Sequence, residues 1–422
     1  MQKFKYDHMN ETLEEFYNHL LGIKSPWKVI SIQRDSRNRI VTAIVELSKD
    51  EQLICPECQN PGKLHDHRIR KWRHLDSCNH QTFIQASIPR VKCALHGIKQ
   101  IPVSWAEKNS HFTMEFESIV ILWLKEDSIS TVAENFGLTW DQVDGIMTRA
   151  VRRGISRRKK TSTENMGIDE TSYQKRHEYV TVILDKDRDV VIDVLNDRKA
   201  ETLKNWFKTQ ELSDLSGIKS ISMDIWDPFI NAVNSNFANA SEIINFDRFH
   251  IAQHFGKAVD KIRARENREF LEAWGISPLA KSKFQWLKNS TRTDNRASKR
   301  KKFLALTRMN LKTARAWRIK EAASMLWYYS YKGSAEKKWK ELLIWISHCR
   351  LEPMIKVGQM IREYFWGILN AIRLKSNNSM LEAKNSRIQR IKKIACGFRN
   401  RERFKNAILF HLGGLDLFPI AT

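Results

Sequence analysis

Met166-Gly167-Ile168-Asp169-Glu170 is the stretch that decides the fold, because an apolar run here ends in an acid and a later segment repeats the pattern. The repeat is Ile218-Lys219-Ser220-Ile221-Ser222-Met223-Asp224, which also ends in an aspartate. A third acid, Glu382, lies in a segment with helical character. Two carboxylates at strand ends and a third on a later helix predict a site that gathers divalent metals for phosphoryl transfer on nucleic acid.

The residues around the two aspartates predict an α/β domain. Strands are expected over 179–184, 190–195 and 242–246, with helices over 199–209 and from Pro228. The turn at 185–189 indicates that the first two of these strands form a hairpin. The resulting order of three strands, a helix, a strand, a helix and a strand is ribonuclease-H-like.

The chain of 422 residues is strongly basic, with 72 Lys and Arg, 48 Asp and Glu and a net charge of +24. This excess favours a polyanionic partner such as DNA, bound through phosphate contacts and counterion release. Hydrophobic residues make up 42%, which predicts folded domains. No apolar stretch approaches the ~18 residues of a spanning helix, and residues 1–8 lack the core of a signal peptide. We therefore expect a soluble intracellular protein.

Two short motifs predict a structural zinc centre. Cys55-Pro56-Glu57-Cys58 supplies a C-x2-C pair and Cys93-Ala94-Leu95-His96 a C-x2-H pair. Such knuckles provide the tetrahedral thiolate and imidazole ligands of zinc, so the predicted ligands are Cys55, Cys58, Cys93 and His96. Two alternatives stay open: Cys78 or His80 could replace a ligand, or the thiols could bind no metal.

The segment 129–143 has the pattern of a helix-turn-helix, with Gly137 ending one helix and Thr139 capping the next. Residues 139–150 are predicted to form a recognition helix in a DNA major groove, although an ordinary helical corner is the alternative. Basic residues on this helix and in the linker after it are predicted to contact phosphates: Arg149, Arg152, Arg153, Arg157, Arg158, Lys159 and Lys160.

From about residue 250 to 375 the sequence predicts helices throughout, because a structureless loop of that length would be unusual. The predicted fold is multidomain α+β: an N-terminal zinc ribbon and helix-turn-helix, then a ribonuclease-H-like α/β catalytic core interrupted by an all-helical insertion. The predicted segments are 1–48 (N-terminal helix and strand), 49–108 (zinc-binding ribbon), 109–160 (helix-turn-helix and basic linker), 161–254 (first part of the core), 255–372 (helical insertion) and 373–422 (C-terminal core helices that carry Glu382).

Two further acids near the aspartates have weaker patterns. Glu170 follows Asp169 on a predicted strand, where adjacent side chains point to opposite faces, so it is a poor metal ligand. Asp247 follows the strand that ends at residue 246 and precedes His250. A direct metal role for Asp247 and a phosphate contact by His250 both stay open.

Taken together, these motifs resemble bacterial insertion-sequence transposases of the ISL-three family, which are DDE transposases. The resemblance runs almost end to end. It covers the zinc-binding segment (55–58 and 91–99), the first catalytic motif (167–170), the second (222–228), the segment after it (246–250), the third (378–385) and a basic tail (394–400). One departure precedes Glu382, where Ser379-Met380-Leu381 stands in place of the more usual glycine, apolar residue and valine.

The resemblance implies a transposase that binds the terminal inverted repeats of its insertion sequence and catalyses DNA cleavage and strand transfer. It implies that Asp169, Asp224 and Glu382 are catalytic and hold two Mg²⁺ (or Mn²⁺) ions, beside the structural Zn²⁺. The implied partners are double-stranded DNA, at the repeats and the target, and further copies of the chain in a homo-oligomer. The implied location is the cytoplasm, at the bacterial nucleoid. Basic residues on or just after the Glu382 helix are expected to contact phosphates: Arg387, Arg390, Lys392 and Lys393.

Two other functions stay open. A domesticated, catalytically silent DNA-binding regulator would bind DNA without cutting it, but candidate acids are intact at all three catalytic positions. A structure-selective nuclease of the ribonuclease-H type would have the same acids. The N-terminal DNA-binding motifs and the long helical insertion favour the transposase over that nuclease.

Overall fold

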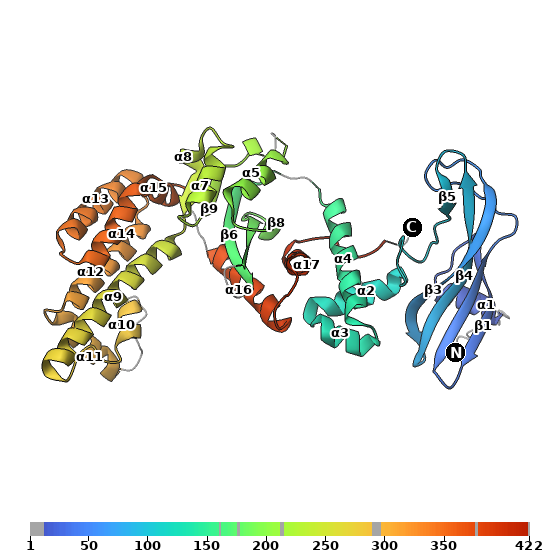
Figure 1. Cartoon of the computed structure of the whole chain (residues 1–422), viewed down its shortest axis with the longest axis horizontal. Helices are drawn as coiled ribbons and strands as arrows, with labels where there is room; N and C mark the ends of the chain where they lie inside the picture. The colour runs from blue at the N-terminus through green and yellow to red at the C-terminus, as the bar shows by residue number, and fades with distance from the viewer. Residues whose placement is uncertain are drawn as a thin grey trace, which may run out of the picture. The chain divides into compact units, whose positions relative to one another are not determined.

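A computed structural model describes residues 12–159, 162–174, 178–211, 215–288, 297–375 and 379–420. The chain divides into two compact units, the first made of Met1–Arg158 with Leu415–Thr422 and the second of Lys159–Gly414. The first unit thus takes both ends of the sequence, coloured blue and red in Figure 1. None of the described helices has both the length and the apolar composition that crossing a membrane requires.

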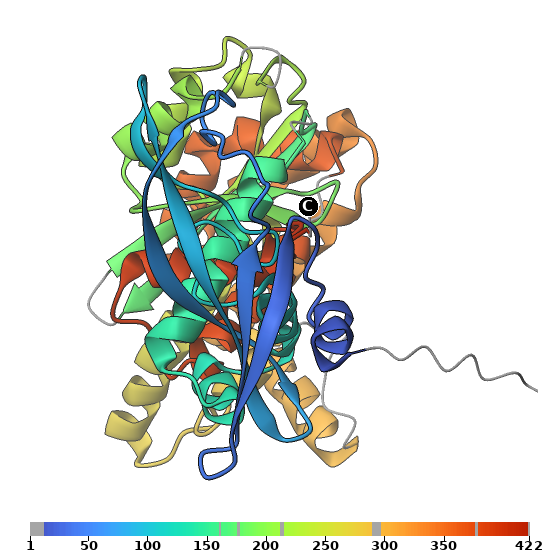
Figure 2. The same cartoon turned by 90° about the vertical axis from the view of Figure 1, so that its right-hand side faces the viewer.

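The first unit begins with a five-stranded sheet. Helix α1 (Leu13–Leu20) precedes strands β1 (Trp27–Asp35), β2 (Ile40–Leu47), β3 (Lys63–Ser77), β4 (His80–Cys93) and β5 (Gly97–Gln100). The strand order is β1-β2-β4-β3, with β5 paired to β4, and Figure 2 shows the length of the β3–β4 ribbon. Trp27 and Trp72 each meet Trp105 edge to face in the core, with ring centroids 5.3 and 5.5 Å apart.

Three helices follow the sheet and form the predicted helix-turn-helix. They are α2 (Met114–Glu126), α3 (Ile129–Phe136) and α4 (Trp140–Arg157). Gly137 ends α3 in the left-handed region, with a φ of 61° that glycine adopts without strain. Thr139 begins α4 through a capping box with Gln142. The two local signals in the sequence therefore set the turn where it was predicted.

The C-terminal segment 415–420 packs into this first unit and completes a buried charge network. Arg153 of α4 is buried and donates to both carboxylate oxygens of Glu107, at 2.6 and 2.8 Å. It also donates to Glu117 at 3.1 Å and to the backbone carbonyl of Leu417. Because a buried guanidinium is costly unless its N–H groups are bonded, the C-terminal segment is part of the structural core of this unit.

Removal of residues 415–422 should therefore destabilise the first unit. Leu417 is only 2% exposed, and losing its burial costs about 1.5–3 kcal/mol. Leaving the buried N–H of Arg153 without the Leu417 carbonyl adds about 1–3 kcal/mol. We expect the melting temperature of the first-unit transition to fall by about 10 °C or more in differential scanning calorimetry.

The matched control is a shorter truncation that removes only residues 419–422. It retains the Leu417 side chain and the Phe418 carbonyl, which accepts from Arg157 at 2.6 Å. Its melting temperature should stay close to that of the parent protein. Equal melting temperatures for the two truncations would contradict the structural role of the segment.

The second unit contains a mixed five-stranded sheet of order β10-β9-β6-β7-β8. Its strands are β6 (Asn165–Gln174), β7 (Glu178–Asp185), β8 (Val190–Leu195), β9 (Ser220–Met223) and β10 (Ile244–Phe246). The pairs β6–β7 and β7–β8 are antiparallel, whereas β9 runs parallel to β6 and β10 parallel to β9. Helices α5 (Ala200–Lys208), α7 (Asp227–Asn234) and α8 (Ala240–Ile243) lie in the connections. The strands predicted over 179–184 and 190–195 are β7 and β8.

Alternation along the three parallel strands β6, β9 and β10 gives this part of the sheet one apolar and one polar face. The apolar positions lie in a single hydrophobic core: Met166, Ile168, Ile221, Met223, Ile244 and Phe246. Residues between them point the other way because successive strand side chains alternate. Ser222 and Asn245 are buried on that second face and hydrogen-bond to each other at 2.8 Å. The candidate acids follow these polar positions.

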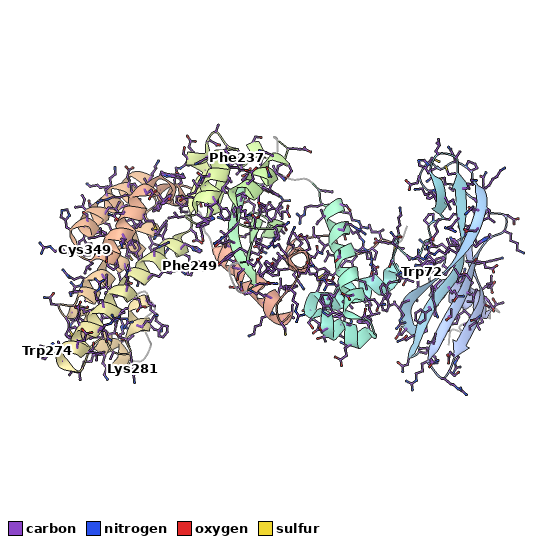
Figure 3. All side chains as sticks on the ribbon, in the orientation of Figure 1. Trp72, Phe237, Phe249, Trp274, Lys281 and Cys349 are labelled. Atoms are coloured by element: carbon purple, nitrogen blue, oxygen red, sulfur yellow. The ribbon has the colours of Figure 1, made fainter. Side chains whose placement is uncertain are left out.

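A helical region follows β10 and shares the core of the sheet. It comprises α9 (Arg248–Trp274), α10 (Lys283–Leu287), α11 (Ala297–Arg308), α12 (Lys312–Met325), a 3-10 turn (Leu326–Tyr328), α13 (Lys332–His348), α14 (Glu352–Glu363) and α15 (Phe365–Arg373). One hydrophobic cluster runs from Met166 on β6 to Ile372 on α15. In Figure 3, Phe249 marks the end of α9 nearer the sheet and Trp274 the other end. The helices predicted between 250 and 375 are therefore present, and they pack on one another and reach the sheet through α15.

Two last helices, α16 (Ser379–Ile394) and α17 (Arg401–Leu412), return the chain to the sheet. Helix α16 packs on β6 and α17 on β8. Close approach of α16 depends on Gly167, because a Cβ there would lie 2.8 Å from Cδ2 of Leu381. This contact places Glu382, the next residue, beside the strand that carries Asp169.

Candidate active site and metal centre

Asp224 and Asp247 leave neighbouring parallel strands at the same edge of the sheet. In the β9–β10 pair, Met223 stands opposite Phe246, and the backbone N–H of Asp247 donates to the carbonyl of Met223 at 3.0 Å. His250 lies in the first turn of α9. One ligand atom each from Asp224, Asp247 and His250 lies within 4.8 Å of the others.

Asp169 lies inside β6, not at its end as the sequence pattern predicted. The parallel pairing of β6 with β9 stops at Gly167 and Ser222, but β6 continues beside β7 as far as Gln174. Asp169 therefore stands just beyond the end of β9 on a strand that runs on. Its side chain is buried, with Oδ1 accepting from the Glu170 backbone N–H at 2.7 Å.

Helix α16 connects the third predicted acid to this site. The side-chain amide of Asn385 donates to Oδ2 of Asp169 at 2.5 Å. Glu382 lies three residues before Asn385, so both occupy the same side of α16. Glu382 itself is exposed. The structure thus brings Asp224 together with Asp247 and His250, and brings the Glu382 helix against Asp169.

Negative charge accumulates among these acids. Burial raises the pKa of Asp169 to about 6. Burial, followed by the charges of Asp169, Asp247 and Glu170, raises the pKa of Asp224 to about 8. Burial and then the charge of Asp247 raise the pKa of Glu382. Raised pKa values in a group of neighbouring carboxyls mean that their negative charges are unfavourable together, and a bound cation would stabilise them.

Glu170 has a different role from the other acids. It pairs with Arg198 at 3.1 Å, and the Arg198 guanidinium lies over the Trp226 ring, 5.0 Å from its centroid. On the polar face, Lys186 donates to Ser222 at 2.8 Å, and burial lowers the pKa of Lys186 to about 8. Arg198 and Lys186 are therefore cationic side chains that lie near the acids.

Sequence reasoning left Asp247 and His250 undecided, but Asp247 has a sequence signal that could have placed it. Asn245-Phe246-Asp247 alternates in phase with Ser222-Met223-Asp224. Parallel neighbours in phase present their polar residues on one face, which puts the two aspartates side by side. The aspartate at 247 also caps α9, with Oδ1 accepting from the Phe249 N–H at 2.7 Å. Because aspartate is common at the start of a helix, this capping role gives no indication that Asp247 lies beside Asp224.

The four predicted zinc ligands form a second cluster, in the first unit. Distances are 3.8 Å from Cys55 Sγ to His96 Nδ1, 3.7 Å from Cys93 Sγ to the same nitrogen, and 3.6 Å between the sulfurs of Cys58 and Cys93. All four ligand atoms lie within 4.8 Å of one another. Tetrahedral zinc with Zn–S of ~2.3 Å and Zn–N of ~2.0 Å separates its ligand atoms by about 3.5–3.8 Å. The cluster therefore fits a structural zinc ion.

Backbone N–H groups prepare two of the three thiols, those of Cys93 and Cys55, for a metal. N–H groups of His96 and Leu95 lower the pKa of Cys93, and the N–H of Cys58 lowers that of Cys55. A lowered pKa favours the thiolate, which is the form that binds zinc. Donation of backbone N–H groups to metal-bound sulfur is also the outer-shell support that such sites need.

Cys78 and His80, the alternative ligands, lie at the opposite end of the β3–β4 hairpin. Ser77 pairs with His80 next to the turn, whereas Cys93 ends β4 at the knuckle. Cys78 is exposed in the turn with a φ of 50°, and its carbonyl contacts Nδ1 of His80 at 2.9 Å. Neither residue belongs to the cluster of four.

The basic residues predicted to contact DNA fall into two groups. Arg149 and Arg157 are half-buried and pair with Glu117 at 2.6 Å and Asp416 at 3.2 Å. Arg153 is buried between carboxylates, and its N–H groups donate to partners inside the unit. It is therefore not placed to make the DNA phosphate contact that the sequence predicts. Arg152 and Lys159 are exposed, and Arg158 is half-buried. Lys160 lies outside the described residues.

The basic residues of α16 divide in the same way. Arg387, Arg390 and Lys393 are exposed. Arg387 lies 3.9 Å from a carboxylate oxygen of Asp189, at the edge of ion-pair range. Lys392 instead donates its Nζ to the carbonyl of Ser172 at 2.9 Å. Three of the four predicted side chains therefore face solvent.

Comparison with protein families gives three matches in chain order. A family model described as a transposase of the DDE type, ISL3 group, matches residues 166–408, more than half of the chain. A zinc-finger of transposase IS204/IS1001/IS1096/IS1165 matches residues 51–96. A helix-turn-helix domain of transposase family ISL3 matches residues 101–151. The second of these covers all four residues of the zinc-compatible cluster, and the first covers the acids.

Individual relatives point the same way. The chain is 25% identical over 388 residues to the transposase for insertion sequence element IS1557 of two Mycobacterium tuberculosis strains, covering 85% of this chain and 86% of the relative. It is 21% identical over 355 residues to the transposase for insertion sequence element IS1001 of Bordetella parapertussis, covering 83% and 87%. With zinc-ribbon and helix-turn-helix domains that imply DNA binding, this chain belongs to the ISL3 family of transposases.

Proposed function

We propose that this protein cuts DNA at the terminal inverted repeats of its own insertion sequence and joins the released 3′-OH to target DNA. The observation that carries the proposal is the gathering of buried acids from β6, β9 and the start of α9, with the Glu382 helix packed against them. Membership of a transposase family makes DNA the substrate of that site.

The second unit would be a ribonuclease-H-like core with a helical insertion. Numbered in chain order, its strands lie across the sheet as fifth, fourth, first, second and third. The second strand runs antiparallel to the other four. The insertion would be the region from α9 to α15, since it separates β10 from the Glu382 helix. This topology brings acids that are distant in sequence to one end of the sheet.

Asp169, Asp224 and Glu382 would hold the two divalent ions. Hard carboxylate oxygens suit Mg²⁺ and Mn²⁺. Burial and then the charge of neighbouring acids raise the pKa of all three side chains, which a bound cation would reverse. When bound, the ions would supply a more acidic nucleophile and stabilise the leaving oxygen. Asn385 would fix the orientation of Asp169 through its hydrogen bond.

The reaction would take place as two in-line exchanges at phosphorus. Water first attacks a phosphodiester at the repeat edge, breaking one P–O bond, forming another and releasing a 3′-OH. That 3′-OH then attacks a target phosphodiester in the same way. Paired cutting of two ends would require at least two protomers on the DNA.

DNA would be bound by the exposed basic and polar surface. The N-terminal part of α4 would enter the major groove with the exposed side chains of Gln142 and Thr148. Phosphate contacts would come from the half-buried Arg158 and from five exposed cations: Arg152, Lys159, Arg387, Arg390 and Lys393. Such contacts would place the protein on the nucleoid DNA of its host.

Cleavage of a labelled duplex tests the proposal. The duplex carries the terminal repeat taken from DNA that flanks the gene, and cleavage is followed with Mg²⁺ or Mn²⁺. The parent protein should nick the repeat edge in a metal-dependent reaction, and Glu382→Gln should reduce the rate about a thousandfold, because the substitution removes one metal-binding charge. Glu201→Gln, which neutralises an exposed acid on α5, should cut like the parent.

Two results would count against the proposal. Specific binding of the repeat without cutting under either metal, with paired ends present, would identify a DNA-binding regulator. Cleavage by Glu382→Gln at the parent rate would exclude Glu382 from the site and leave the third acid unassigned.

A further inference from the structure

We infer that Asp224, Asp247 and His250 form one divalent-metal site in which His250 supplies a nitrogen ligand, so that the site prefers Mn²⁺ to Mg²⁺. The inference rests on the proposed function, because it refines the ligand set of the metal held beside Asp224. It adds two ligands to the triad of Asp169, Asp224 and Glu382.

The first argument is the geometry of the three side chains. Nδ1 of His250 lies 3.0 Å from Oδ2 of Asp224, and Nε2 of His250 lies 3.9 Å from Oδ2 of Asp247. One ligand atom from each residue lies within 4.8 Å of the other two. In a six-coordinate centre with metal–ligand bonds of ~2.1 Å, adjacent ligand atoms stand about 3 Å apart and opposite ones about 4.2 Å. An ion would bind only one ring nitrogen of His250, and the 4.8 Å limit on one ligand atom from each residue is compatible with a common coordination sphere.

The second argument is the position of the Asp247 carboxylate beside His250. The side chain of Asp247 is 6% exposed. Its Oδ1 caps α9 by accepting from the Phe249 N–H. Its Oδ2 lies 3.9 Å from Nε2 of His250, and the charge of Asp247 also acts on the ammonium group of Lys186. Buried carboxylates are ordinarily satisfied by donors, water or metals, and Oδ2 stands where an ion could bind both it and His250.

The third argument concerns charge. Capping explains Oδ1 of Asp247 but not the choice of a charged residue, because asparagine caps a helix equally well without a charge. The negative charge of Asp247 acts on Asp169, Asp224 and Glu382 together. A fourth like charge in this place is unfavourable unless a cation binds there. The charge of Asp247 is thus a cause that raises the pKa of all three other acids.

The nitrogen sets the metal preference. Mg²⁺ is bound almost entirely by oxygen in near-ideal octahedra, whereas first-row transition metals accept imidazole. A set of two carboxylate oxygens and one imidazole nitrogen therefore favours Mn²⁺. Asp169 and Glu382 supply oxygen only, so the preference belongs to the position beside Asp224.

Metal binding to the tag-free full-length protein tests this inference. Mn²⁺ binding is followed by electron paramagnetic resonance, with Mg²⁺ as competitor, in the presence and absence of a terminal-repeat duplex. The parent should bind Mn²⁺ at least tenfold more tightly than Mg²⁺ and show nitrogen modulation in the pulsed spectrum of the bound ion. Asp247→Asn keeps the helix cap, so it should fold like the parent but bind Mn²⁺ at least tenfold more weakly.

Substitutions on α9 separate the nitrogen ligand from its surroundings. His250→Asn should remove the nitrogen modulation and the preference for Mn²⁺ while leaving Mg²⁺ binding within about threefold. His254→Asn is the matched control, because His254 lies one turn further along α9 and outside the cluster. It should keep the parent spectrum and affinity.

Several outcomes would overturn the inference. Parent-like Mn²⁺ affinity in Asp247→Asn would reduce Asp247 to a helix cap, and nitrogen modulation that survives His250→Asn would exclude His250. Equal binding of both metals by a protein that cuts the repeat would refute the inference and leave the proposed function standing. Loss of Mn²⁺ binding in both variants of a protein that never cuts would do the reverse.

Discussion

Replacing Asp224 with asparagine should abolish strand cleavage and, in buffer free of Mg²⁺ and Mn²⁺, stabilise the second unit at pH 8 and above. The two effects have one cause. That cause is the negative charge of Asp224, which burial and the neighbouring carboxyls make unfavourable without a metal. The same charge would bind a metal ion. Loss of one ligand removes several kcal/mol of transition-state stabilisation, which corresponds to about a thousandfold or more in rate.

The pH dependence follows from the direction of the pKa shift. Burial and the neighbouring acids raise the pKa of Asp224 from 3.8 to about 8 in the folded protein. Folded protein then binds an extra proton between about pH 4 and pH 8, so its stability is greatest below that range and falls as the pH rises through it. A difference of one in pKa corresponds to about 1.4 kcal/mol, so the free energy of unfolding falls by on the order of a few kcal/mol across this pH range. Asp169, with a pKa of about 6, adds a loss of the same sign.

Urea unfolding at pH 5, 7 and 9 measures this dependence. The parent protein should lose stability steadily with pH, whereas Asp224→Asn should show a flatter profile and exceed the parent at pH 9. Added Mn²⁺ should stabilise the parent by mass action, by about 2.7 kcal/mol at a hundredfold excess over Kd, and have little effect on the variant. Glu201→Gln should follow the parent throughout. Parallel profiles for parent and Asp224→Asn would show that Asp224 has no raised pKa.

Alternation of apolar and polar residues predicts the sheet of the second unit because each central strand buries one face. It gives β8 at Val190–Leu195 and β7 to within one residue at each end. It fails at Asp169, where the acid suggests a strand end but pairing with β7 carries β6 on to Gln174. The end of a strand depends on its partner, and the partner is not visible in the local pattern.

The candidate site shows the same limit. Asp169, Asp224 and Glu382 each have a local motif, and so does the cysteine knuckle. Asp247 has the ordinary pattern of a residue that caps a helix, and only the register of β10 beside β9 brings it to Asp224. A lone histidine such as His250 likewise has no signal until α9 places it against that pair.

Long-range partners decide the role of Arg153. On a helix next to a basic linker it has the sequence character of a phosphate contact. Its partners are Glu107, 46 residues away, and the carbonyl of Leu417, 264 residues away. The segment around Leu417 is too short for its sequence to predict where it packs. Internal salt bridges and DNA contacts use the same side chains, so only the fold distinguishes them.

Replacing Cys93 with serine should release the zinc from the first unit and unfold the knuckle around it. Cys93 ends β4 and shares the cluster with Cys55, Cys58 and His96. Changes in the outer shell of a zinc site alone cost 10–100-fold in affinity, so loss of a thiolate ligand should cost more than about 100-fold. Zinc content, measured by inductively coupled plasma mass spectrometry, should fall from one ion per chain to nearly none.

The unfolding should be local because the knuckle and the sheet are held by different interactions. Residues 53–62 have little regular structure beyond a single bridge between Ile54 and Pro61 and a few backbone hydrogen bonds. None of them belongs to the hydrophobic core that contains Trp72. Metal binding therefore supplies most of the stability of the knuckle, whereas the sheet retains its own core.

Limited proteolysis with tryptophan fluorescence distinguishes local from global unfolding. In Cys93→Ser, cleavage should appear within residues 51–62 while the emission of the buried tryptophans stays that of the folded sheet. Cys78→Ser is the matched control, because Cys78 is exposed at the opposite end of the same hairpin. It should keep its zinc and resist proteolysis. Zinc lost from Cys78→Ser, or retained by Cys93→Ser, would move the metal to the alternative ligands and show that the clustered thiols are not its site.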